Sequence, residues 1–149
     1  MKRIDKFEEE KISVKKFFDN NGINCENFIF SKGEEPCDIY CKDTGQQFQI
    51  TWNEHDFQKK IRTAPSGTMI TQSRTIEEEL DDFIFTPVMK KVAVYGKSAH
   101  GIILLVISPK NFPFGEKELE QAKNKILNIQ NNFFTEIFLV CPTNNIKIF

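Results

Sequence analysis

EPCDIYCKDTGQQFQITW, residues 35–52, is the stretch of the chain that decides the fold. Within it, DTGQ at 43–46 is a turn signal, and the runs on either side alternate polar and apolar residues. This pattern is typical of the two strands of a β-hairpin. If residues 44 and 45 form a two-residue loop, Cys41 pairs with Phe48. We therefore expect an antiparallel hairpin in this register.

The expected register sorts the side chains of the hairpin onto two faces. The apolar residues fall on one face and are expected in the core: Ile39, Cys41, Phe48 and Ile50. On the other face Asp38 lies opposite Thr51, with Gln49 as its diagonal neighbour. A slip by one residue would mix the two faces, so the hydrophobic pattern favours this pairing. The hairpin is thus predicted to carry a polar triplet on one side.

This polar triplet carries a family resemblance. Pro36-x-Asp38, a hairpin, and then Gln49-Ile50-Thr51 on the second strand resembles the signature of the PD-(D/E)XK nucleases, which share the restriction-endonuclease-like fold. In that family two acids bind a divalent metal, and a lysine two residues after the second acid helps to position or activate water. Residues two apart on a strand point to the same side.

The resemblance implies a magnesium or manganese site with Asp38 and Gln49 as ligands. Gln49 stands where the second acid is expected and can still offer a neutral carbonyl oxygen to a metal. Thr51 stands where the lysine is expected and cannot supply its charge. The sequence thus departs from the family signature at two of its positions.

A third ligand is expected from the first helix, because many members of this family place a further acid there. Residues 4–20 have apolar residues at helical spacing, and we choose Glu10 for this role. The alternative is that Glu8, Glu9 and Glu10 form a solvated face that complements the helix dipole.

A second long helix is predicted over residues 75–96. TIEE at 75–78 is a capping box, and Gly96 ends the pattern. Pro87 either kinks this helix or starts a second one with Thr86 as its cap. The apolar side comprises Ile76, Leu80, Phe83, Ile84, Val88, Val92 and Tyr95.

The same helix offers a lysine for the catalytic role that Thr51 cannot fill. Lys91 lies in the apolar sector, whereas Lys90 points about a hundred degrees away around the helix. If the protein cleaves its substrate, we expect Lys91 to supply the charge. The alternative is a lysine whose stem lines the edge of the core while its ammonium group reaches water.

The remaining elements complete the expected fold. GIILLVI at 101–107 reads as a strand buried on both faces, and a helix and a second strand at 136–141 follow it. Such a crossover should be parallel and right-handed. The order of elements over residues 1–149 is similar to the restriction-endonuclease-like αβββαβ core, an α/β domain with a mixed central sheet flanked by helices.

Between the hairpin and the second helix lies the best local basic patch, which is suited to phosphate contacts. It comprises Lys59, Lys60, Arg62 and Arg74. A short helix is expected at 53–62. His55 lies there, but the sequence supplies no nucleophile for a mechanism that depends on it.

Composition limits the classes of protein to which the chain can belong. The net charge of -1 gives no global electrostatic footprint for nucleic acid. The longest apolar run is too short to span a membrane, and the charged N-terminus does not resemble a signal peptide. We therefore expect a soluble, cytoplasmic protein that does not enter a membrane. Its four cysteines lack zinc-knuckle spacing and are expected to be reduced and buried.

Two classes of function follow. The first is a divalent-metal-dependent nuclease that acts on the phosphodiester bonds of nucleic acid, with Asp38, Gln49, Thr51 and Lys91 at its catalytic site. The second is a non-catalytic module with the same fold that binds nucleic acid, a protein partner or a second copy of the chain. The two substitutions in the acid-x-lysine motif count against catalysis.

Overall fold

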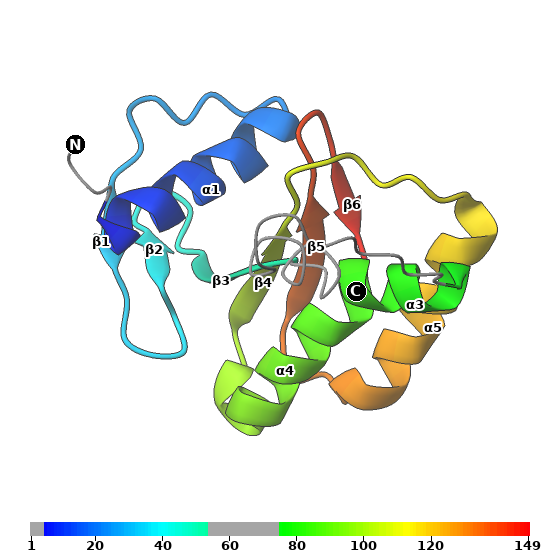
Figure 1. Ribbon diagram of the computed structural model, residues 1–149. Coiled ribbons are helices and arrows are strands. Elements are labelled where there is room, and N and C mark those ends of the chain that lie inside the picture. The colour runs from blue at the N-terminus through cyan, green and yellow to red at the C-terminus, as the bar shows by residue number, and fades with distance from the viewer. Residues whose placement is uncertain (1–4, 54–74) are drawn as a thin grey trace, which may run out of the picture.

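The computed structural model describes residues 5–53 and 75–149, in which one mixed β-sheet lies between two layers of helices (Figure 1). The elements in chain order are α1 (Lys6–Asn20), β1 (Phe30–Lys32), β2 (Ile39–Cys41), β3 (Gln47–Trp52), α3 (Ile76–Leu80), the π-helical turn η1 (Asp81–Phe85), α4 (Thr86–Tyr95), the 3-10 turn η2 (Gly96–Ala99), β4 (Ile102–Ile107), α5 (Glu116–Gln130), β5 (Glu136–Val140) and β6 (Asn145–Lys147).

The six strands of the described residues lie in the sheet in their order along the chain, from β1 to β6. Pairing is antiparallel from β1 to β3, parallel from β3 through β4 to β5, and antiparallel again between β5 and β6. The predicted parallel neighbours, residues 102–107 and 136–140, are confirmed. The chain therefore has a mixed α/β fold with an open sheet, as far as the described residues show.

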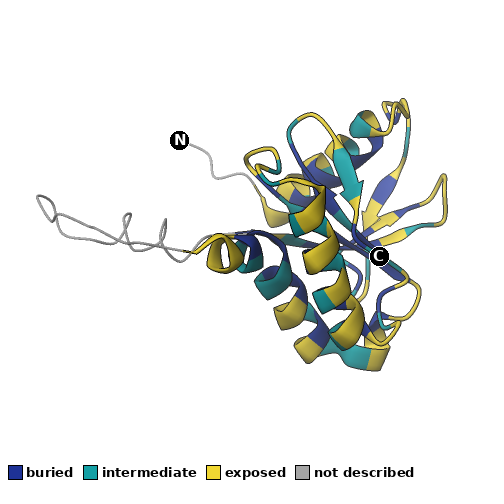
Figure 2. Ribbon diagram, turned by 90° about the vertical axis from the view of Figure 1, so that its right-hand side faces the viewer, coloured by how far each residue is buried: buried dark blue, intermediate teal, exposed yellow. Residues whose placement is uncertain are grey.

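Each face of the sheet has its own hydrophobic core, because side chains alternate along every strand. Ile103 and Leu105 of β4 belong to the cluster that α1 covers. Leu104 and Val106 belong to the cluster covered by α3, α4 and α5. Figure 2 shows the outcome, with buried residues along the strands and exposed ones on the outer faces of the helices. The prediction that β4 is buried on both faces is confirmed.

The hairpin of β2 and β3 forms, but its register differs from the predicted one by two residues. Ile39, not Cys41, pairs with Phe48. The loop has four residues, 42–45, because the Gly45 N–H donates to the Cys41 carbonyl over 2.8 Å and the glycine adopts a φ of 73°. A shift by two leaves the apolar side chains of the hairpin on one face, so Ile39, Cys41, Phe48 and Ile50 are confirmed as buried core residues.

Other boundaries also differ from the predictions. The capping box at Thr75 is confirmed, but Ile76 is 61% exposed and not part of the core. Of the two alternatives at Pro87, a second α-helix does begin there, but Thr86 is its first residue and not its cap, because the preceding residue is Phe85 and its backbone is already helical.

The chain stays helical through Pro87, where a side chain supplies a hydrogen bond that the proline cannot make. A proline inside a helix has no N–H to donate to the carbonyl four residues earlier, which here is that of Phe83. The side-chain amide of buried Asn53 donates to this carbonyl over 3.0 Å. The π-helical turn η1 lies immediately before the proline-containing helix.

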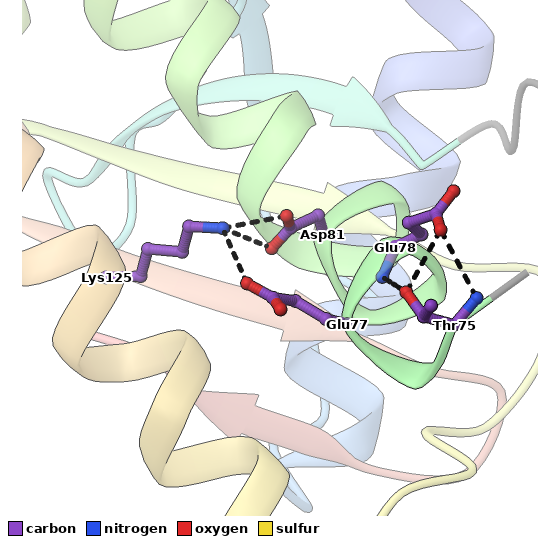
Figure 3. A network of polar contacts seen from close by, with 5 residues as sticks. All are labelled: Thr75, Glu77, Glu78, Asp81 and Lys125. Atoms are coloured by element: carbon purple, nitrogen blue, oxygen red, sulfur yellow. Dashed lines mark hydrogen bonds and ion pairs between the residues drawn. The ribbon is translucent and has the colours of Figure 1, made fainter.

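A polar network joins this helical stretch to α5 (Figure 3). Lys125 of α5 donates to both carboxylate oxygens of Asp81, over 2.9 and 2.7 Å, and lies 4.0 Å from Glu77. Its ammonium group is 4.6 Å from the centre of the Phe85 ring. These contacts hold η1 against α5. Among the helices of the described ranges, none combines the length and apolar character needed to cross a membrane.

Candidate functional site

A cavity of about 540 Å³ opens between the beginning of α1 and the segment that joins β1 to β2. Figure 1 shows this end of α1 beside the first two strands of the sheet. Glu10 and Asp38 both line the cavity, and their side chains share a hydrogen bond. The structure thus brings together two of the predicted metal ligands.

The position of Asp38 follows from the way β2 begins. Its backbone N–H donates to the Phe48 carbonyl over 2.7 Å, which places it one residue before the strand. Its carboxylate accepts the N–H of Ile50 over 2.9 Å. The Asp38 side chain therefore takes the place of a strand carbonyl at the point where β2 and β3 separate.

A close approach of the backbone supports this segment. Gly33 donates its N–H to the Asp38 carbonyl over 3.2 Å. A Cβ atom at Gly33 would overlap the Sγ atom of Cys37 and would lie 2.7 Å from the Cys37 carbonyl oxygen. Only glycine fits there without a shift of the chain.

Glu10 differs from its two neighbours in the acidic run of α1. Glu8 and Glu9 are exposed, as expected for a solvated face, whereas Glu10 is only 6% exposed. It lies one turn before Val14, which is fully buried under the helix. The helical period therefore turns this single glutamate of the three toward the sheet.

Burial and the neighbouring carboxylate together raise the pKa of Glu10 to about 7. Loss of hydration is the largest cause, followed by the hydrogen bond to Asp38 and the negative charge of Asp38. The positive charges of Lys6 and Lys32 act in the opposite direction. Since Asp38 also accepts a backbone N–H, we place the shared proton on Glu10.

Gln49 is buried and hydrogen-bonded, whereas a metal ligand is expected to face an accessible site. Its side chain is 1% exposed, and its amide nitrogen donates to the Pro36 carbonyl over 2.5 Å. Continuing the observed register places it opposite Asp38, although Gln49 does not line the cavity. Thr51 is half-buried farther along β3, where it pairs with Val106 of β4.

Tyr95 does not line the cavity but contacts Glu35, which does, and the sequence gives no signal for this contact because helical spacing places Tyr95 on the apolar side of its helix. Its hydroxyl donates to the Glu35 carboxylate over 3.1 Å. Burial, this hydrogen bond, and the charges of Glu35 and Asp38 raise the pKa of Tyr95, while a hydrogen bond involving Gln49 lowers it. Tyr95 thus links the end of α4 to the segment before β2.

Lys91 lies one helical turn before Tyr95, with its ammonium group 5.7 Å from the centre of the tyrosine ring. It is half-buried, whereas Lys90 is exposed, which agrees with the predicted orientation of the two lysines. Lys91 does not line the cavity that holds Glu10 and Asp38. Its catalytic role stays a prediction.

Two further predictions concern other parts of the sequence. The basic patch of Lys59, Lys60, Arg62 and Arg74, together with His55, lies outside the described residues. The four cysteines are free and buried.

Within residues 5–53 and 75–149, no three His, Cys, Asp or Glu side chains are grouped so that they could hold a metal ion. A metal at Glu10 and Asp38 would therefore need oxygen donors of other kinds.

Comparison with known proteins gives no match for this chain, whether among protein-family models, curated proteins or solved structures.

Proposed function

We propose that this protein is a divalent-metal-dependent nuclease whose metal ligands are centred on Glu10 and Asp38. The observation that carries the proposal is the hydrogen-bonded pair of carboxyl groups in a cavity that two lysines also line. Two carboxylates held this closely repel each other unless a proton or a cation lies between them. The proton on Glu10 thus marks a place where a divalent cation would be favourable.

The donor set fits magnesium. This ion takes oxygen ligands and is often held by one or two carboxylates, with water and substrate phosphate completing its shell. Glu10 and Asp38 would supply the carboxylates, and Gln49 an amide oxygen if its bond to Pro36 reorganises. When bound, magnesium would activate a water molecule and offset the charge that develops on the phosphate. Manganese prefers similar donors.

The residues of the chain would then have separate tasks. Asp38 is oriented by the Ile50 N–H and so presents its carboxylate in a fixed direction. Glu10 would have to lose its proton to hold a metal, and its pKa of about 7 places this loss close to neutrality. Tyr95 would orient the Glu35 carboxylate at the wall of the cavity through their hydrogen bond.

The order of the elements also supports the proposal. An initial helix, three antiparallel strands, a helical stretch and a strand parallel to β3 follow one another as in the αβββαβ core of the restriction-endonuclease-like fold. The candidate ligands lie on its first helix and its hairpin. A fold does not establish an activity, so the proposal depends on the site.

The test is cleavage of labelled single-stranded and duplex DNA and RNA in magnesium, in manganese and in EDTA. We expect metal-dependent cleavage by the wild type and a loss of at least about a hundredfold in Glu10→Gln and Asp38→Asn. Glu8→Gln, which changes an exposed acid on the same helix, should retain activity. Equal cleavage by Asp38→Asn and the wild type would rule out this site.

The second candidate is a non-catalytic module with the same fold. It is favoured by Gln49, whose amide is already bonded to the Pro36 carbonyl, and by Thr51, which lacks the charge of a lysine. Magnesium binding without cleavage of any of these nucleic acids would select this alternative. Its ligand would then be sought among nucleic acids and proteins by direct binding.

A further inference from the structure

We propose that Lys6 and Lys32, not Lys91, form the phosphate-binding side of the cavity and contact the phosphodiester group of the substrate. This inference rests on the nuclease function proposed above and deepens it. Both lysines line the same cavity as Glu10 and Asp38, and both act electrostatically on Glu10. They come from two elements that are distant in sequence.

Lys32 is directed to the cavity by the alternation of β1. Phe30, two residues earlier, is buried on the face that α1 covers, with its ring centre 6.2 Å from that of Phe18. Lys32 therefore lies on the α1 face as well. It pairs across the strands with Ile39, the residue that follows Asp38. This places a cation at the edge of the sheet next to the candidate metal ligand.

Lys6 reaches the cavity from the opposite wall. It lies four residues before Glu10 on α1, and residues at this spacing share one face of a helix. It is exposed, as is Lys32, so both ammonium groups are accessible to a ligand. The two lysines thus approach the Glu10 and Asp38 pair from a helix and from a strand.

Neither lysine forms an ion pair with another residue of the described ranges. Within the part of the chain that the structure describes, the closest carboxylate partners of Lys6 and Lys32 lie beyond 4.0 Å. Lys125 shows the contrast, since Asp81 holds it at 2.7 Å. The ammonium groups of the cavity thus remain available for an anion, and a phosphate is the anion that lysine commonly binds as a point charge.

The acidic residues of the cavity explain why such an anion would need a metal. Asp5 and Glu35 line it in addition to Glu10 and Asp38, so its carboxyl groups outnumber its two lysines. A phosphodiester alone would be repelled at short range. With magnesium on the carboxylates, the lysines and the ion would attract the phosphate together.

The alternative lysine is less well placed. The ammonium group of Lys91 lies over the ring of Tyr95, and Lys91 is not part of the cavity wall. The hydroxyl of Tyr95 is in turn bonded to Glu35. Lys91 therefore contacts the site through tyrosine and has a structural role in the arrangement described.

The experiment follows amide chemical shifts by NMR while dimethyl phosphate, a phosphodiester monoanion, is titrated into the protein with and without magnesium. We expect shifts at Gly33 and Asp38 that require magnesium. In Lys6→Ala/Lys32→Ala, binding should weaken by about tenfold or more for each lysine. The matched control is Lys16→Ala/Lys42→Ala, which removes two exposed lysines from α1 and from the hairpin loop. This control and Lys91→Ala should bind as the wild type does.

The outcomes separate this inference from the proposed function. If magnesium shifts the Asp38 amide but Lys6→Ala/Lys32→Ala binds dimethyl phosphate as well as the wild type, the lysine assignment is wrong and the metal site stands. If only Lys91→Ala weakens the binding of dimethyl phosphate, the assignment of Lys6 and Lys32 is likewise wrong and the metal site stands. If the lysine-dependent shifts occur equally without magnesium, the lysines bind the phosphate and the claim that this anion needs the metal is wrong. If dimethyl phosphate causes no shifts in the wild type, the inference is wrong.

Discussion

Glu10 gives the candidate site a pH dependence that can be measured without any substrate. Its pKa is raised from 4.5 to about 7 in the folded protein. The folded state therefore holds a proton that the unfolded state has already lost between these two values. It follows that the stabilising effect of this proton is complete below about pH 4.5 and is lost as the pH rises through about 7.

We expect Glu10→Gln to stabilise the protein at alkaline pH. Glutamine resembles the protonated carboxyl group, so it avoids the buried charge. The free energy of unfolding should rise by about 1–3 kcal/mol at about pH 8 and change little at about pH 4.5. Urea unfolding at both pH values measures this, with exposed Glu9→Gln as the control. A uniform effect of Glu10→Gln at both pH values would contradict the assigned proton.

Gln49 and Thr51 allow a test of whether residues 49–51 are an acid-x-lysine motif that has lost its acid and its lysine. Gln49→Glu would place a carboxylate against the Pro36 carbonyl and opposite Asp38, because the amide donor of the wild type is lost. Without metal, this change should cost about 1–3 kcal/mol of stability. Magnesium should restore part of the loss.

The double variant Gln49→Glu/Thr51→Lys should then bind magnesium more tightly than the wild type, because it supplies the acid and the cation that the motif lacks. Calorimetric titration of the folded variant measures the affinity, and cleavage assays show whether activity appears. If its affinity for magnesium equals that of the wild type, the interpretation of residues 49–51 as a metal-binding motif is wrong.

At the scale of elements, the helical stretch after residue 75 depends on a side chain from the end of the sheet. The Asn53 side chain donates a hydrogen bond to the Phe83 carbonyl. Pro87, four residues after Phe83, cannot do so because proline has no N–H. We expect Asn53→Ala to lower the free energy of unfolding by about 1–2 kcal/mol, because a buried hydrogen bond is lost. Chemical denaturation measures this. Asn124→Ala, at an exposed position of α5, is the control, and an equal effect of the two variants would argue against this role for Asn53.

The hairpin shows which features of an element a sequence can determine. Alternation assigned Ile39, Cys41, Phe48 and Ile50 to the core correctly, because a face depends only on whether a position is odd or even. Register depends on the loop, and the sequence fits both a two-residue and a four-residue loop. The Gly45 N–H bond to Cys41 decides between them in the folded chain. The pairing was therefore wrong while the faces were right.

At the scale of the whole molecule, the parallel crossover could be predicted because continuous apolar strands and an intervening helix leave few topologies. The candidate site could be predicted only in part. Glu10 and Asp38 were identified from the resemblance, and the fold brings them together. Lys32 and Tyr95 carry no local signal, because their places at the site depend on how β1 and the end of α4 meet the hairpin.

The most direct test of the central claim is a crystal structure obtained with manganese, with anomalous scattering recorded to locate the ion. We predict an anomalous peak between the carboxylates of Glu10 and Asp38, with the Glu10 proton displaced, and no such peak in Asp38→Asn crystals grown under the same conditions. Manganese bound elsewhere, or a Glu10–Asp38 hydrogen bond that persists at saturating manganese, would contradict the account.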